Sequence, residues 1–292
     1  MKVLITGGNG QLGSTIKEML REKKCSLGKI DKTYFHCKVI AEGKYTLNIT
    51  SLENVKNYFI KSKPHIVINT AAYTNVDGCE SNIDLAYKVN ALGPRNLAIA
   101  CETINAKLIH ISTDYVFDGK SKLPYKEFDL PNPINIYGKS KYLGEEYVKQ
   151  FCSRYFIVRT SWLYGQIGKN FVKTILKTSK EKKYLEIIED QTGNPTNAQD
   201  LAYHILKLAL TDEYGIYHCT GNGQCSWYEF AKAIIQYANI DCKINPISSY
   251  AYKPIAKRPS YSSLDHMMLR NTIGDAMRYW QDALKDFLNT LS

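Results

Sequence analysis

The first fourteen residues, MKVLITGGNGQLGS, restrict the fold more than any other part of the chain. The short apolar run KVLIT has the composition of a buried strand. Gly7, Gly10 and Gly13 follow at once in a G-x-x-G-x-x-G spacing and open a segment with helical periodicity. A strand, a glycine turn and a helix in this order let the backbone approach a pyrophosphate at the helix N-terminus. The segment therefore predicts a dinucleotide site, and the alternative is a turn that needs glycine only for its shape.

The rest of the first half of the chain continues to alternate strand and helix patterns. We expect strands at 34–40, 65–72, 107–113 and 155–161, and helices at 82–105 and 137–151. Thr50, with Glu53 three residues later, has the spacing of a helix N-cap. Regular alternation predicts an α/β fold, a Rossmann-like doubly wound parallel sheet covered by helices on both faces.

The pattern loosens after about residue 160, where helical stretches alternate with loops rich in Pro, Gly and Asn. These helices are expected near 170–182, 198–211, 226–239 and 280–291. We therefore expect residues 1–160 to form an NAD(P)-binding Rossmann domain, to which part of 190–220 returns. Residues 161–292 are expected to form mainly a smaller α+β substrate-binding lobe.

Composition excludes several other classes of protein. A hydrophobic share of 44% and a charged share of 23% are ordinary for a globular chain. No apolar run is long enough to cross a bilayer, and the N-terminus is not a signal peptide, so we expect a cytoplasmic protein with no membrane partner. The net charge of +10 comes from mixed lysine runs typical of a solvated surface, and no nucleic-acid-binding motif is present.

The cysteines and histidines predict neither disulfides nor a metal centre. Eight cysteines are scattered without a C-x-x-C pair, so we expect them to be reduced and partly buried. The six histidines show no ligand spacing, which argues against a zinc site.

Tyr137 and Lys141 are candidates for proton transfer. They stand four residues apart in INIYGKSKYLGEE, where a helix places both side chains on one face. Thr113 ends the predicted strand 107–113 and so falls at the sheet edge where doubly wound folds bind ligands. A lysine ammonium and the positive charge of a nicotinamide would together favour the phenolate and lower the tyrosine pKa toward neutral, where acid catalysis is more effective. The spacing alone also fits an ordinary surface helix.

Several segments together resemble a known family, the extended short-chain dehydrogenase/reductases. Among these the likeness is greatest to the dTDP-4-dehydrorhamnose reductase family and runs nearly end to end. The segments that carry it are the glycine loop, NTAAYTNVDGCE (69–80), STDYVFDG (112–119), Y-G-K-S-K, VRTSWLYG (158–165), NFVKT (170–174), DQTGNPT (190–196), CSWYEFA (225–231) and A-K-R-P (256–259).

The resemblance implies a role for each matching residue. Tyr137 would donate a proton to the C4 oxygen of the sugar, Lys141 would hold the nicotinamide ribose, and Thr113 would hydrogen-bond the keto oxygen. The implied cofactor is NADPH or NADH, bound at Gly7, Gly10, Gln11, Leu12, Gly13, Asn48, Ile49, Ala71, Ala72 and Tyr73 as well as at Tyr137 and Lys141. The implied substrate is a dTDP-sugar, bound by Thr113, Asp114, Trp162 and Arg258.

Some positions leave alternatives open. Glu42, near the end of the second predicted strand, is the candidate for the adenosine ribose, but Lys44 would suit a 2′-phosphate. Trp162 could instead belong to a core, Arg258 to a surface turn, and Asp190 could shape a loop.

The chain departs from the family pattern at two places. Asn48 stands where relatives carry an aspartate near the adenine. Thr15 and Gln199 stand where some relatives carry glutamates that bind a divalent ion at a dimer interface. A hard cation needs oxygen ligands, usually charged ones, so we expect that metal site to be missing or altered.

Other functions compete with reduction on the same fold. A nucleotide-sugar dehydratase needs a carboxylic acid where this chain has Tyr115, so dehydration is disfavoured, while an epimerase is harder to exclude. A third option is a non-catalytic NADP-binding subunit resembling the regulatory subunit of methionine adenosyltransferase. The oligomeric state is left open, with a homodimer as one option.

Overall fold

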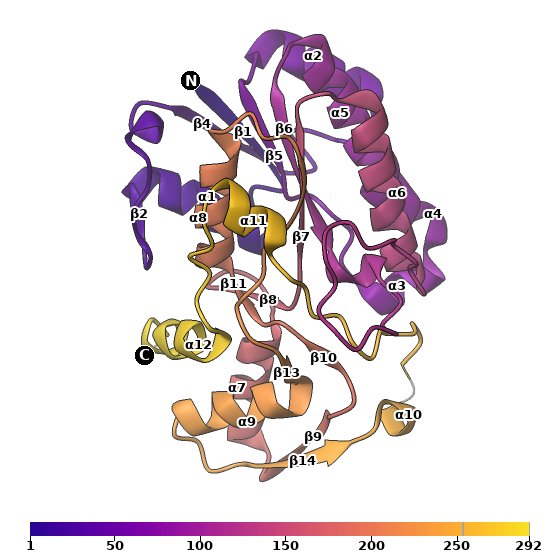
Figure 1. The fold of residues 1–292 in the computed structure, drawn as a ribbon, viewed down its shortest axis with the longest axis vertical. Coiled ribbons are helices and arrows are strands. Elements are labelled where there is room, and N and C mark those ends of the chain that lie inside the picture. The colour runs from indigo at the N-terminus through magenta and orange to yellow at the C-terminus, as the bar shows by residue number, and fades with distance from the viewer. Residues whose placement is uncertain (253, 292) are drawn as a thin grey trace.

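Six parallel strands form the central sheet in the computed structural model, which describes residues 1–252 and 254–291 (Figure 1). In chain order they are β1 (Lys2–Thr6), β4 (Lys38–Glu42), β5 (Ile66–Asn69), β6 (Lys107–Thr113), β7 (Tyr155–Thr160) and β12 (Gly215–His218). Their spatial order is β12-β7-β6-β5-β1-β4, and each neighbouring pair is parallel. The order reverses between β1 and β5, where doubly wound sheets bind ligands outside the carboxyl ends of the strands. The predicted α/β fold class is confirmed.

Helices cover both faces of this sheet, as Figure 1 shows. Side chains alternate along β1, so Val3 and Ile5 enter one core layer and Leu4 enters the other. Helices α1 (Gln11–Glu22) and α8 (Ala198–Ala209) pack on the first face, and α2 (Leu52–Ser62), α5 (Gly93–Thr103) and α6 (Ile136–Phe151) pack on the second. Burial on both faces explains why the strands read as continuous apolar runs.

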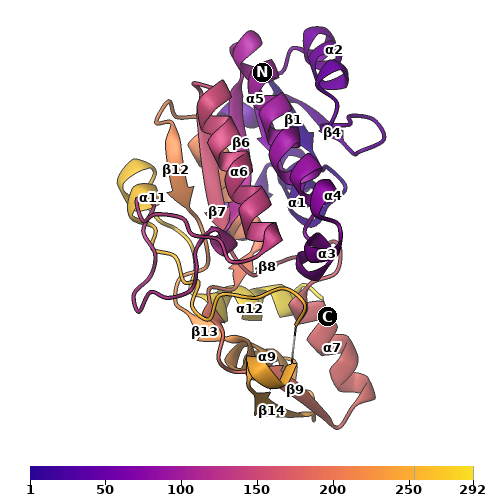
Figure 2. The ribbon, with the colours of Figure 1, turned by 90° about the vertical axis from the view of Figure 1, so that its right-hand side faces the viewer.

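A smaller lobe lies below the carboxyl edge of the sheet (Figures 1 and 2). Its helices are α7 (Phe171–Glu181), α9 (Trp227–Tyr237), α10 (Ser249–Tyr252) and α12 (Trp280–Asn289). Its short strand pairs are β8 (Leu163–Tyr164) with β11 (Thr196–Asn197), β10 (Thr192–Gly193) with β13 (Cys225–Ser226), and β9 (Tyr184–Ile188) with β14 (Lys243–Ile247). Phe230 and Trp280 belong to a separate apolar core in this lobe. The chain crosses between the two parts more than once, since α8 and β12 return to the sheet.

The remaining elements are short. They are β2 (Lys24–Cys25), β3 (Gly28–Lys29), α3 (Val76–Ser81), α4 (Ile83–Tyr87), α11 (Met267–Thr272), the 3-10 turns Lys32–Tyr34 and Asp114–Val116, and the π-helical turn Lys88–Leu92.

The second strand and the cap of the helix that follows it differ from the sequence prediction. The strand runs over Lys38–Glu42 rather than 34–40, because the chain before it forms a 3-10 turn that buries Tyr34. The N-cap is Ser51, whose hydroxyl accepts from the backbone N–H of Asn54. The prediction for Thr50 is wrong because its hydroxyl donates instead to the side chain of Asn48, two residues earlier.

The helix predicted over 82–105 is interrupted by the π-helical turn Lys88–Leu92. Pro94 has no N–H to donate to the carbonyl of Asn90 four residues earlier, so the α-helical ladder cannot continue there. A side-chain carbon on Gly144 would lie 2.2 Å from that carbonyl oxygen. Glycine at 144 therefore lets α6 pack closely against the π turn.

All eight cysteines are free in the structure, and six of them are buried. Within residues 1–252 and 254–291, no helix combines the length and the apolar character needed to cross a membrane.

Candidate active site

The glycine loop leaves room for a phosphate group above β1. Gly7 has φ +69°, and a side-chain carbon there would lie 2.7 Å from the backbone nitrogen of Ala71. A side-chain carbon on Gly13 would lie 2.4 Å from the carbonyl oxygen of Gly7. Helix α1 starts after Gly10 with no side-chain cap and no acidic residue in its first turn. Its first N–H groups therefore suit an anion, and the loop fits a dinucleotide pyrophosphate.

Gln11 and Leu12 can face a pyrophosphate only through their backbone. The side chain of Leu12 is 5% exposed and belongs to the sheet core. The Gln11 amide nitrogen donates to the carbonyl of Leu163 (3.0 Å), and its oxygen accepts from Asn170 (2.9 Å). The Gln11 side chain therefore ties the start of α1 to the smaller lobe.

The residues predicted near the adenosine lie at and after the end of β4. Glu42 accepts a hydrogen bond from the hydroxyl of Tyr58 (2.6 Å), and its backbone oxygen accepts from Gly8. Asn48 is exposed, and its side-chain oxygen accepts from the N–H and hydroxyl of Thr50. Ile49 is buried. The side-chain oxygen of Asn48 is thus already engaged in hydrogen bonds within its own turn.

Ala71, Ala72 and Tyr73 follow β5 after Thr70, and the backbone of Ala71 lies against Gly7 of the glycine loop. Asn90 bonds both backbone groups of Tyr73 (2.8 and 3.1 Å) and also donates to the hydroxyl of Ser140 (3.1 Å). It therefore joins the segment after β5 to the helix that bears Tyr137. Sequence reasoning missed Asn90, although an amide in the otherwise apolar stretch YKVNALGP was a usable signal.

Tyr137 and Thr113 meet at the carboxyl edge of the sheet. Tyr137 lies in the first turn of α6, which Asn135 caps by accepting from the N–H of Gly138 (2.7 Å). Thr113 ends β6 and is 5% exposed. Burial raises the pKa of Tyr137, and a hydrogen bond with Thr113 opposes that rise. A phenol that holds its proton beside a hydroxyl suits proton donation to a ligand oxygen.

Lys141 lies beneath this pair, one turn along α6. Its ammonium donates to the carbonyl of Ile111 (2.5 Å), and its side chain is 2% exposed. Burial lowers the pKa of Lys141 to about 8, although Glu145 opposes the change. In the polypeptide itself, burial of the phenol is the largest influence on the Tyr137 pKa. A lowering of that pKa by Lys141 together with a bound nicotinamide stays a prediction.

Asp114 and Tyr115 complete the wall around Tyr137. Asp114 is 2% exposed and accepts from the Thr113 hydroxyl (3.0 Å). Burial raises the pKa of Asp114 to about 7, against the effect of hydrogen bonds from Ser262 and Thr113. The ring of Tyr115 lies edge-on to Tyr137, with centroids 5.8 Å apart. Asp114 is therefore a carboxyl group that titrates near neutral pH beside the candidate proton donor.

Trp162 lies in the smaller lobe and is held rigidly. Its backbone has φ +44°, a strained value for a tryptophan. Its ring stacks on Trp227 with centroids 3.5 Å apart and planes within 6°. A side-chain carbon on Gly193 would lie 2.7 Å from the indole, so the ring is covered there as well. Contact of Trp162 with a sugar stays a prediction.

Two of the positions left open by the sequence now have partners. Arg258 pairs with Asp77 of α3 (2.7 Å). Asp190 accepts from the backbone and hydroxyl of Ser249 (2.9–3.0 Å). Asp190 thus shapes a loop.

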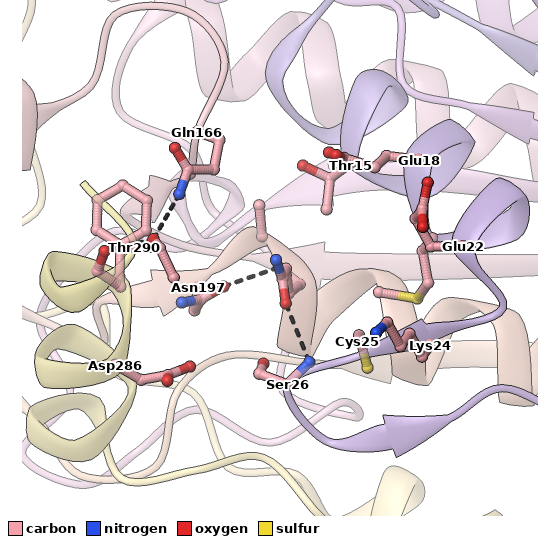
Figure 3. Close-up of a pocket in the computed structure, with 15 residues that line it drawn as sticks. Thr15, Glu18, Glu22, Lys24, Cys25, Ser26, Gln166, Asn197, Asp286 and Thr290 are labelled. Atoms are coloured by element: carbon pink, nitrogen blue, oxygen red, sulfur yellow. Dashed lines mark hydrogen bonds between the residues drawn. The ribbon is translucent and has the colours of Figure 1, made fainter. Parts of the chain in front are cut away.

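Thr15 and Gln199, the positions of the glutamates in some relatives, line one cavity of about 400 Å³ between α1, α8 and α12 (Figure 3). The side-chain oxygen of Gln199 accepts from the backbone N–H of Ser26 (3.1 Å). Thr15 donates to the carbonyl of Gln11 in its own helix. Both polar groups therefore have protein partners, and the altered metal site stays a prediction. This cavity does not include Thr113 or Tyr137.

The glycine cradle, the switch point beside it and the Thr113–Tyr137–Lys141 set define a dinucleotide-dependent oxidoreductase of the short-chain dehydrogenase/reductase class. Within that class, the chain belongs to the RmlD substrate binding domain family, whose model matches residues 1–292.

Individual relatives are similar over their whole length. The spore coat polysaccharide biosynthesis protein SpsK of Bacillus subtilis is 40% identical over 291 residues, covering 100% of this chain and 98% of that protein. A crystal structure of a dTDP-4-dehydrorhamnose reductase from Clostridium acetobutylicum is 45% identical, with a TM-score of 0.94 over 100% of this chain and 99% of the other. The dTDP-4-dehydrorhamnose reductase of Bacillus anthracis, solved in complex with NADP, is 44% identical, with a TM-score of 0.92 over 99% of each chain. The resemblance seen in the sequence is confirmed.

Proposed function

We propose that this protein reduces the C4 keto group of dTDP-4-dehydro-6-deoxy-L-mannose to give dTDP-L-rhamnose, using NADPH or NADH. The observation that carries the proposal is the meeting of Tyr137 and Thr113 at the carboxyl edge of the same sheet whose switch point bears the glycine loop. Whole-length similarity to dTDP-4-dehydrorhamnose reductases supports the choice of substrate.

The nicotinamide, when bound, supplies the hydride to C4. Tyr137 donates its phenolic proton to the C4 oxygen, and the Thr113 hydroxyl orients that oxygen. A protonated phenol is ready for this step, since burial raises the Tyr137 pKa. Lys141, whose ammonium is already fixed on the Ile111 carbonyl, would hold the nicotinamide ribose. Asp114 closes the site beside the sugar.

The proposal is tested by following NAD(P)H oxidation with the dTDP-4-keto sugar. Tyr137→Phe should lower kcat by about 10²–10⁴-fold, the range typical of a lost general acid. NADPH binding, measured by fluorescence, should be retained in this variant. Tyr142→Phe changes another tyrosine of the same helix and serves as the matched control.

The outcomes separate the competing functions. Wild-type protein that shows no substrate-dependent oxidation would remove the reductase proposal and favour a non-catalytic NADP-binding subunit. Interconversion of the sugar without net cofactor consumption would favour an epimerase. A fully active Tyr137→Phe variant would remove only the proton donor.

A further inference from the structure

Helix α3 (Val76–Ser81) carries two carboxylates, Asp77 and Glu80, three residues apart in the motif NTAAYTNVDGCE. Neither has a role in the chemistry described above. Each binds a different part of the candidate site, and together they connect the smaller lobe to the start of the helix that bears Tyr137.

Asp77 binds the segment formed by residues 254–260, which passes beneath α3 in Figure 1. One carboxylate oxygen accepts from Arg258 Nη2 (2.7 Å), and the other accepts from Arg258 Nη1 (3.2 Å) and from the N–H of Ala256 (2.9 Å). Arg258 also donates to the carbonyl of Ala256 (3.0 Å). A two-pronged pair of this kind fixes the plane of a guanidinium as well as its position.

The same segment is joined to the first turn of α6. The amide nitrogen of Asn135, the N-cap residue, donates to the carbonyl of Lys257 (2.7 Å). Glu80 accepts from the N–H of Ile136 (2.8 Å), the residue before Tyr137. The position of the 254–260 segment is therefore coupled to the position of the proton donor.

The positive charge of Arg258 acts on a residue of the candidate site, Tyr115. Burial raises the pKa of Tyr115, and the positive charge of Arg258 opposes that rise. Tyr115 lies edge-on to Tyr137, with ring centroids 5.8 Å apart. The Arg258 side chain is 17% exposed and is paired with Asp77 (2.7 Å). A planar cation at this place suits the diphosphate of a nucleotide-sugar.

We propose that Asp77 is a positioning residue that holds Arg258 and the 254–260 segment in the orientation that binds the substrate diphosphate. This inference rests on the proposed function for the identity of the nucleotide-sugar. It assigns Asp77 no contact with substrate: its effect passes through Arg258.

A double-mutant cycle tests this with dTDP as the probe, by calorimetric titration of the full-length protein. Asp77→Asn and Arg258→Ala should each weaken dTDP binding by about tenfold, the scale expected for a lost charge-assisted contact. The double variant should bind dTDP about as weakly as the Arg258→Ala variant, because both substitutions disrupt the same Asp77–Arg258 pair. In each variant the KM for the keto sugar should rise with the dTDP Kd and by more than kcat falls, while the NADPH Kd should stay within about twofold.

Asp212→Asn is the matched control, since it removes an ion pair with Lys107 (3.0 Å) at the opposite edge of the sheet. Its dTDP Kd should equal that of wild type. If Asp77→Asn fails to fold, Asp77→Glu takes its place. The longer side chain keeps the negative charge but displaces the Arg258 guanidinium, so it should weaken dTDP binding severalfold.

Unchanged dTDP binding in the Asp77 variants, or additive losses in the double variant, would overturn the positioning role. Failure of the wild type to bind dTDP would overturn it as well. Tight dTDP binding that Asp77→Asn weakens, without turnover of the keto sugar, would support the positioning role while removing the proposed reductase function.

Discussion

Replacing Asp114 with asparagine should stabilise the protein at pH 8 and lose most of that advantage at pH 5. The side chain is 2% exposed, and burial raises its pKa from 3.8 to about 7. Between these two values the native state holds a proton more readily than the unfolded chain, so the contribution of Asp114 to stability falls as the pH rises. At about 1.4 kcal/mol per pH unit, the free energy of unfolding loses up to about 4 kcal/mol across this window.

Asparagine removes this titration while keeping an oxygen that can accept from the Thr113 hydroxyl. Urea unfolding at pH 5, 6, 7 and 8 gives the free energy of unfolding of both proteins. The difference in favour of the variant should grow by about 1.4 kcal/mol per unit between pH 5 and 7 and level off by pH 8.

Asp118→Asn, on the loop that follows, is the control, and its effect on stability should not vary with pH over the same range. Burial of Asp118 is outweighed by hydrogen bonds from Lys120, Asn132 and Tyr125, which lower its pKa. The Asp118 carboxylate contributes to the free energy of unfolding above pH 3.8, and this contribution is lost below that pH. The effect of Asp118→Asn on the free energy of unfolding should therefore be constant from pH 5 to 8. A stability difference for Asp114→Asn that is likewise independent of pH would show that the buried carboxylate is fully compensated, and would refute the reasoning.

Two further changes test the cofactor cradle and the core beneath the site. Gly13→Ala should abolish NADPH binding measured by fluorescence, because the added carbon would lie 2.4 Å from the carbonyl oxygen of Gly7; normal binding would show that the loop shifts freely. Arg159→Met should lower the free energy of unfolding by about 3–5 kcal/mol in urea titration, because it leaves the fully buried Glu145 without its 2.7 Å partner. Glu145→Met in the same chain should recover most of that loss, and no recovery would contradict the buried-charge explanation.

Sequence reasoning was most successful where the signal is local. Strand β1, the glycine turn and α1 follow one another within the first 22 residues, so neighbouring residues alone carried the prediction. The same holds for α6, expected at 137–151 and found at Ile136–Phe151. Residues 82–105 have the apolar periodicity of one continuous helix, and the sequence predicts one. The missing N–H of Pro94 interrupts the hydrogen bonding but leaves that periodicity unchanged, so the pattern does not reveal the π-helical turn.

The pKa shift of Tyr137 shows a second limit of prediction from sequence. A spacing of four residues brings a lysine onto the same helix face, but it says nothing about how much water the phenol loses. That loss of water depends on the packed surroundings of the ring, and in the polypeptide itself it raises the pKa of Tyr137. Desolvation is a property of the packed surroundings, whereas charge proximity within a helix follows from spacing.

The amino-acid order was sufficient for the fold class and for the strand, glycine turn and helix of the dinucleotide cradle, since glycine spacing and apolar periodicity are short-range properties. It also made Thr113, Tyr137 and Lys141 candidates for the reaction. The partners of these residues depended on folding. Asp77 meets Arg258 across 181 positions of chain, and Asn90 reaches Ser140 across 50. Such contacts form because the sheet and the smaller lobe bring distant segments to one edge, and hydrogen bonds between them depend on distances that no local pattern encodes.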